Sequence, residues 1–169
     1  MTEHYGNPSS IHGFGEPVRK GIERAREQVA ALLGAAHDSE IIFTSCATEA
    51  NSTAILSAVE ALPERKEIIT TVVEHPAILE VCEHLERRGY TIHRLPVDNQ
   101  GRLDLAHYQS LLSENVALVS VMWANNETGT VFPVQTMATM AKEKGVLFHT
   151  DGVQAVGKFP IQIGRASCR

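Results

Sequence analysis

Short apolar segments alternate with longer amphipathic segments along most of this chain, and this alternation constrains the fold more than any other feature. Apolar residues three and four positions apart predict helices, and short apolar runs bounded by polar or glycine residues predict buried strands. The predicted strands cover residues 40–44, 67–73, 90–95, 116–122 and 146–149. The predicted helices cover residues 15–33, 48–62, 76–88, 104–112 and 134–144.

Helices between successive strands require crossover connections, and crossovers join parallel strands. The sequence therefore predicts an α/β fold: a three-layer, mostly parallel sheet with helices on both faces. We find no internal repeat, no low-complexity segment and no convincing domain boundary within residues 1–162. In open sheets of this kind, ligands bind beyond the carboxyl ends of the strands.

Composition narrows the class of function. The chain has 20 acidic and 15 basic residues, a formal net charge of −5, and no block of lysine and arginine. This disfavours a nucleic-acid surface. No apolar run approaches the roughly 20 residues of a membrane span, and no segment resembles a signal peptide. We therefore expect a cytoplasmic protein with no membrane and no nucleic acid among its partners.

Cysteine and histidine usage gives no support for a metal site or a disulfide framework. The three cysteines form no CxxC motif, and the eight histidines form no HxxxH or HxH pair. Paired ligands at such spacings are typical of zinc sites, and an even cysteine count at regular spacings is typical of disulfide-stabilised domains. We predict neither.

Polar residues directly follow four of the predicted strands, at residues 45–49, 74–76, 125–129 and 150–154. Because the carboxyl ends of parallel strands lie along one edge of the sheet, we expect these groups to lie close together. Ala47 and Thr48 begin a helix, whose free N–H groups and dipole suit a phosphate. Ordinary N-capping by Ser45 or Thr48, with Glu49 in the first turn, explains the same residues.

Four further side chains in these groups each have a structural and a chemical interpretation. His75 either caps the next helix or stacks on a planar ring and transfers a proton. Asn126 either shapes its turn or hydrogen-bonds a ligand. Asp151 ends an apolar strand, where a carboxylate needs a donor or a cation, and it either caps the following turn or pairs with a protonated ring nitrogen. Gln154 would offer its amide to the same ligand.

Together, a phosphate site, a stacking ring and a carboxylate for a ring nitrogen describe pyridoxal phosphate. The pyridinium nitrogen of this cofactor must stay protonated for the ring to act as an electron sink, and an aspartate partner secures this. A generic nucleotide-binding α/β domain is disfavoured, because the sequence has neither a GxGxxG nor a GxxxxGK[ST] motif.

Five segments carry a resemblance to a known family: GNPSSIHGFG, IIFTSCATEAN, TTVVEHPAILEVCEHLERRG, VSVMWANNETGTV and HTDGVQAVGKFPI. They resemble successive blocks of the cysteine desulfurases of the nitrogen-fixation and iron–sulfur-cluster type. These are pyridoxal-phosphate enzymes of the class V aminotransferase family. The resemblance extends from about Tyr5 to Ile161, in the order and spacing of the family.

The resemblance implies that residues 1–162 are part of the large domain of the fold-type I pyridoxal-phosphate transferases. It implies that Ala47 and Thr48 hold the cofactor phosphate. His75 would be the catalytic residue, stacking on the pyridine ring and assisting proton transfer.

The remaining implied roles concern the ring and the reaction. Asn126 would contact the substrate or the ring side of the cofactor, Asp151 would pair with the pyridinium nitrogen, and Gln154 would hydrogen-bond the phenolic oxygen. The family reaction converts L-cysteine to L-alanine. The sulfur leaves as a protein-bound persulfide for an iron–sulfur scaffold or another acceptor, and the family enzymes are homodimers.

The chain departs from the family pattern at its functional lysine and cysteine. The family binds its cofactor through a lysine in a Ser-x-His-Lys motif, and this sequence has no such motif among its lysines, Lys20, Lys66, Lys142, Lys144 and Lys158. Lys158 corresponds to an ordinary lysine of the VGK segment. The persulfide cysteine of the family also has no counterpart here: Cys46 lies at a position that is often glycine, and Cys82 has a structural position in a predicted helix.

Residues 163–169 match no family pattern and are expected to be a non-native tail, so we assign no role to Cys168. We expect a partial chain that is inactive and poorly soluble by itself. Two other interpretations stay open. In the first, the chain is part of another class V enzyme that resembles the selenocysteine lyases. In the second, it is a truncated, non-catalytic module that binds a partner or dimerises.

Overall fold

The computed structural model describes residues 5–161, which form two compact units, one reaching Phe43 and the other covering Thr44–Pro160. The first unit contains helix α1 (Glu16–Leu33) and the short 3₁₀ helix η1 (Asp38–Glu40). Helix α1 ends at Gly34, which has a φ of 69° and donates its N–H to the carbonyl of Ala30. Glycine occupies this left-handed conformation without steric cost.

The second unit contains four helices, each within one residue of its predicted bounds at either end. They are α2 (Ala47–Ala61), α3 (Pro76–Arg87), α4 (Leu105–Leu111) and α5 (Val134–Glu143). Local signals explain where two of them begin. Pro76 occupies the first turn of α3, where its missing N–H has no helical partner to lose. Asp104 caps α4 by accepting hydrogen bonds from the N–H groups of Ala106 and His107.

These helices connect four parallel strands in the order β2-β1-β3-β4. The strands are β1 (Glu67–Thr71), β2 (Thr91–Leu95), β3 (Val116–Ser120) and β4 (Leu147–His149). β1 pairs with β2 in register Glu67 to Thr91, and β3 pairs with β4 in register Leu118 to Leu147. The predicted parallel α/β fold is confirmed.

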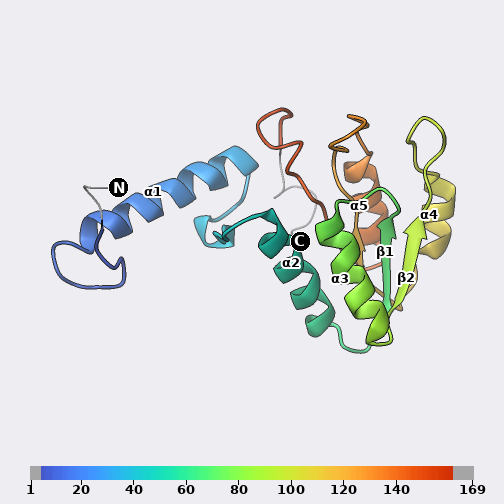
Figure 1. Cartoon of the computed structure of the whole chain (residues 1–169), viewed down its shortest axis with the longest axis horizontal. Helices are drawn as coiled ribbons and strands as arrows, with labels where there is room; N and C mark the ends of the chain where they lie inside the picture. Colours follow the sequence, from blue (N-terminus) through green and yellow to red (C-terminus); the bar gives the residue numbers. More distant parts are fainter. Residues whose placement is uncertain (1–4, 162–169) are drawn as a thin grey trace. The chain divides into compact units, whose positions relative to one another are not determined.

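The sheet lies between two helical layers, each with its own hydrophobic core (Figure 1). On one face, Ile55 of α2 and Ile78 of α3 pack with Ile68 of β1. On the other face, Tyr108 of α4 and Met137 of α5 pack with residues of the same strands. The hydroxyl of the fully buried Tyr108 donates to the carbonyl of Met137 at 2.9 Å, which links α4 to α5.

The predicted strand at residues 40–44 is wrong. Glu40 belongs to η1, and its carboxylate accepts hydrogen bonds from the N–H groups of Ala36 and His37. The residues that follow have no strand partner within the described part of the chain, and Ile42 is 76% exposed. A segment forms a strand only when a neighbour completes its hydrogen-bond ladder, so the sheet has four strands and not five.

Strand order creates a crevice at the carboxyl ends of β1 and β3. These strands are neighbours, yet the chain continues from β1 into α3 on one face and from β3 into α5 on the other. Such a reversal point is where α/β sheets bind ligands.

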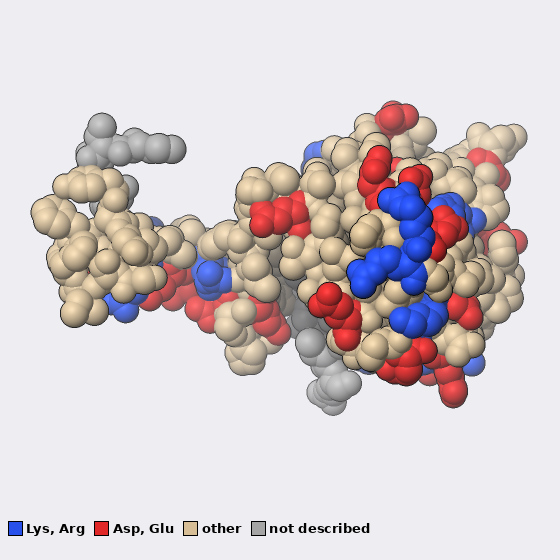
Figure 2. Space-filling view, turned by 60° about the horizontal axis from the view of Figure 1, so that its bottom comes forward, with Lys and Arg blue, Asp and Glu red and all other residues tan. Residues whose placement is uncertain are grey.

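The surface carries charges of both signs. Figure 2 shows Lys and Arg side chains among Asp and Glu on the face in view. Ion pairs on the surface include Arg94–Glu86, at 2.9 Å. Within residues 5–161, no helix has the length and apolar character needed to cross a membrane.

Candidate cofactor site

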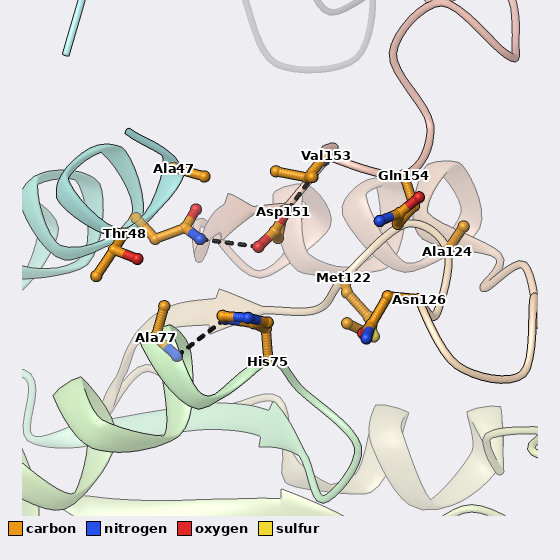
Figure 3. A pocket seen from close by; sticks show the side chains of 11 residues that line it. Ala47, Thr48, His75, Ala77, Met122, Ala124, Asn126, Asp151, Val153 and Gln154 are labelled. Carbon is orange, nitrogen blue, oxygen red and sulfur yellow. Dashed lines mark hydrogen bonds between the residues drawn. The ribbon is translucent and has the colours of Figure 1, made fainter. Parts of the chain in front are cut away.

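A cavity of about 200 Å³ lies in the second unit and is lined by all six residues for which the sequence analysis predicts a role. The six are Ala47, Thr48, His75, Asn126, Asp151 and Gln154. They come from the segments that follow β1, β3 and β4 and from the start of α2. Figure 3 shows their side chains around a common space. The other lining residues are Asn51, Ala77, Met122, Ala124 and Val153.

Asp151 is a buried carboxylate with two hydrogen-bond donors, one for each oxygen. Its side chain accepts from Nδ2 of Asn51 at 2.8 Å and from the backbone N–H of Val153 at 3.0 Å. Asp151 is only 8% exposed, and it forms no ion pair with any other residue in the described range 5–161. Capping of the next turn therefore occupies one oxygen only, and the carboxylate remains a suitable partner for a cation in the cavity.

His75 is both a helix cap and a residue of the cavity wall. It is the N-cap of α3, and its Nδ1 accepts the N–H of Ala77 at 3.1 Å. A neutral imidazole that accepts at Nδ1 carries its proton on Nε2. Capping of α3 is therefore compatible with stacking of the ring and with donation from Nε2–H, whereas protonation of the ring would require Nδ1 to give up its contact with Ala77.

The start of α2 contributes Ala47 and Thr48 to the cavity wall. The first N–H groups of a helix have no partner within it and favour an anion. The N-cap is Cys46 and not Ser45 or Thr48. The nearby N–H of Glu49 lowers the pKa of the Cys46 thiol, with a further contribution from the Ser45 hydroxyl. Negative charge is thus stabilised at this end of α2.

Two adjacent asparagines in the turn that follows β3 have different roles. The Oδ1 atom of Asn125 accepts from the N–H groups of Glu127 and Thr128, and its Nδ2 donates to the carbonyl of Val73 at 3.1 Å. Asn125 therefore shapes the turn, which the sequence analysis weighed as a role for Asn126. The side chain of Asn126 lines the cavity instead.

The amide of Gln154 has a defined orientation. Its Oε1 accepts a hydrogen bond from Nζ of Lys158 at 2.7 Å. With the oxygen engaged, the two N–H groups of the amide are the part that remains for a ligand.

Two buried polar residues of this region were not singled out from the sequence. Asn51 lies one turn beyond Thr48 on α2, is 6% exposed and orients Asp151. Glu74 precedes His75 and is 5% exposed. Its burial raises the pKa of the carboxyl to about 7, against the lowering effect of hydrogen bonds from Met122 and Thr71. Asn51 could have been found from the sequence, because it is a polar residue at a position of the predicted helix that is expected to be buried.

Known proteins match the chain along nearly its whole length. A family model described as aminotransferase class-V matches residues 1–168. A cysteine desulfurase from Enterobacter agglomerans is 69% identical over 163 residues, which are 96% of this chain and 41% of that protein. The cysteine desulfurase NifS of Azotobacter vinelandii is 63% identical over 167 residues, or 99% of this chain and 42% of that protein.

Solved structures agree with these sequence matches. A NifS-like protein superposes with a TM-score of 0.93 at 40% identity, covering 98% of this chain and 46% of that chain. A structure described as SspA in complex with cysteine has a TM-score of 0.90 at 34% identity, covering 96% and 47%. The chain spans less than half the length of each of these relatives.

Proposed function

We propose a function that proceeds from the family match: this chain belongs to the class-V aminotransferase family. In this proposal, the chain supplies cofactor-binding residues of a pyridoxal-phosphate-dependent cysteine desulfurase. The whole enzyme would convert L-cysteine to L-alanine and pass the sulfur, as a persulfide, to a protein of iron–sulfur cluster assembly. The names of the relatives support this reaction over that of a selenocysteine lyase.

The environment of Asp151 is the observation that carries the proposal. A buried carboxylate with only two neutral donors, and with an open cavity beside it, is costly unless a cation completes the site. A protonated pyridine nitrogen is such a cation. Asn51 and Val153 fix the plane of the carboxylate, so that its remaining lone pairs have a defined direction.

The other residues of the cavity fit the rest of pyridoxal phosphate. The N–H groups of Ala47 and Thr48 and the Thr48 hydroxyl would bind the phosphate, and the Gln154 amide would donate to the phenolic oxygen. His75 would stack on the ring. When bound, the cofactor supplies the electron sink for reactions at the amino-acid substrate.

The chain's own residues would perform three tasks in this reaction. Asp151 keeps the ring nitrogen protonated by its charge. His75, whose Nδ1 accepts the N–H of Ala77, would donate a hydrogen bond from Nε2–H to a ligand, and it would take part in proton transfer only when Nδ1 gives up that contact. Asn126 orients the ring side or the substrate from the turn after β3.

The organisation of the whole protein is proposed on the same family grounds. Residues 1–162 would be part of the large cofactor-binding domain of a cytoplasmic homodimer. The expected non-native tail, residues 163–169, and Cys168 within it lie outside the described residues.

Substitution of Asp151 tests the proposal. Pyridoxine phosphate is a suitable probe because it has no aldehyde and cannot react with a lysine. In the 169-residue chain, Asp151→Asn should weaken binding of this probe by about tenfold or more, since the neutral amide cannot pair with the pyridinium. Calorimetric or fluorescence titration gives the dissociation constants.

Asp104→Asn is the matched control for this experiment. It makes the same chemical change at the N-cap of α4, outside the cavity lining, where asparagine caps as well as aspartate. Equal affinities of the wild-type chain and Asp151→Asn, or no binding to the wild-type chain, would contradict the proposed function.

A further inference from the structure

Glu74 is a buried carboxyl group that the proposed reaction does not use. It lies three residues beyond the end of β1 at Thr71, immediately before His75, and is 5% exposed. The cavity lining does not include it. A carboxyl group in this position is costly to bury, so its contacts indicate what it contributes.

The carboxyl of Glu74 connects β1 and β3 where their ladder has ended. The last paired residues of these two strands are Ile69 and Val119. Beyond them, the backbone N–H of Met122 donates to both oxygens of Glu74, at 3.0 and 3.1 Å. The hydroxyl of Thr71 donates to Oε1 at 2.7 Å. Glu74 thus connects the ends of the two strands beyond their last paired residues.

Both residues attached to this bridge belong to the cavity wall. Met122 is hydrogen-bonded to Glu74 directly, and His75 is its neighbour in the chain. The Glu74 side chain therefore helps to set the separation of the His75 and Met122 walls. A second connection across the crevice runs from Nδ2 of Asn125 to the carbonyl of Val73; the same nitrogen contacts Sδ of Met122 but not His75.

We propose that Glu74 is a positioning residue of the cofactor site, which holds the His75 and Met122 walls of the cavity together and does so more strongly when its carboxyl is ionised. An ionised carboxylate accepts the Met122 N–H at either oxygen and with a charge-assisted bond. In the neutral acid, one oxygen carries the proton and the bond to Met122 weakens.

The charge of Glu74 changes in the physiological range. Burial raises the pKa of its carboxyl to about 7, and the negative charge of Asp151, beyond β4, adds to this effect. On α3, the thiol of Cys82 has its pKa raised to about 11, mainly by burial and in part by Glu74. Asp151 and Cys82 are the titratable groups on neighbouring elements that interact with Glu74 in the described structure.

The substitution Glu74→Gln removes the ionisable group but keeps the size of the side chain. Glutamine has the same size, and its single oxygen can accept from both Thr71 and Met122, as Oε1 of Glu74 does. It does not titrate. In the wild-type chain, the amide resonance of Met122 should shift with pH with a midpoint near the raised pKa of Glu74. In Glu74→Gln this transition should disappear.

The binding of pyridoxine phosphate provides the functional measurement. The ratio of dissociation constants, Glu74→Gln over wild type, should be close to one at about pH 5.5 and about fivefold at about pH 8.5, since only the ionised form makes the charge-assisted bond. Taking a ratio cancels the ionisation of the probe itself. Glu80→Gln on α3, where the glutamate is exposed, is the matched control and should give a ratio of one throughout.

Two results would overturn the inference: a Met122 resonance that titrates in the same way in both chains, or an affinity ratio that does not change with pH. The binding measurement rests on the proposed function, but the titration of Met122 needs no ligand. Failure of the wild-type chain to bind the probe, with the Met122 transition present, would therefore count against the proposed function and support the Glu74–Met122 connection.

Discussion

His75 combines a structural contact at Nδ1 and a hydrogen-bond donor at Nε2 in one side chain. Its Nδ1 caps α3, and its ring lines the cavity. Two substitutions separate these contributions, because asparagine is a good N-cap without a ring of this kind, and phenylalanine has a ring but cannot accept a hydrogen bond.

We predict opposite effects of these two substitutions. His75→Phe should lower the free energy of unfolding by about 1 kcal/mol through loss of the cap, and should bind pyridoxine phosphate nearly as well as the wild-type chain. His75→Asn should keep the stability and lose affinity about fivefold, as expected for loss of one stacking contact. Urea denaturation and ligand titration measure the two quantities. If stability and affinity fell together in both variants, the division of roles would be wrong.

Asp151 and Gln154 show how far residue-level reasoning extends. Their positions after a strand allowed both a capping role and a ligand-binding role, and only the four strand ends taken together, with the family resemblance, favoured a ligand site. Their hydrogen-bond partners were not predictable, since Asn51 lies 100 residues before Asp151 in the chain. For the same reason the sequence did not reveal Glu74 as a bridge, because its partner Met122 belongs to another strand end.

At the scale of elements, α4 depends on its N-cap more than the longer helices do. It has only seven residues, and Asp104 accepts two of the N–H groups in its first turn. A short helix has few internal hydrogen bonds to offset the cost of its ends. The buried Tyr108 also contributes, since it packs in the core and its hydroxyl donates to the carbonyl of Met137 on α5.

Asp104→Ala should therefore lower the free energy of unfolding by about 1 kcal/mol, measured by urea denaturation. Asp104→Asn, which keeps a capping oxygen, should stay close to the wild-type value. Neither change should alter the affinity for pyridoxine phosphate. Equal stability of the alanine and asparagine variants would show that the cap contributes little to this domain.

The elements themselves differ in how well the sequence predicted them. Helices were located within one residue because their caps and periodicity are local. Strands β1 and β3 end two residues earlier than predicted, and residues 40–44 form no strand. The apolar pattern there is real, but strand formation depends on a partner elsewhere in the chain, and the pattern carries no information about it.

At the scale of the whole molecule, β4 leaves one edge of the sheet without a neighbour among the described residues. Leu147 on this strand is 44% exposed, and Val153 and Val156 of the same unit are 57% and 40% exposed. Unpaired edges with apolar side chains favour association between chains. These features support the expectation that the 169-residue chain is poorly soluble by itself.

Leu147→Lys should reduce this association, because a charged residue on an edge strand opposes pairing with a second chain. We expect a larger soluble fraction and less light scattering at equal protein concentration. Val72→Lys adds the same charge at an exposed apolar residue outside the edge strand and should have a smaller effect. Equal improvement by both variants would attribute the change to net charge and not to the strand edge.

The sequence by itself determined the class of fold, the position of each α-helix and six of the eleven residues that line the cavity, because periodicity, caps and strand ends are local properties. Only the tertiary structure decided which strands pair, which face each helix covers, and that Asn51 and Glu74 support the site. These contacts join segments far apart in the chain. They depend on how the crossovers bring strand ends together, and no local pattern specifies that arrangement.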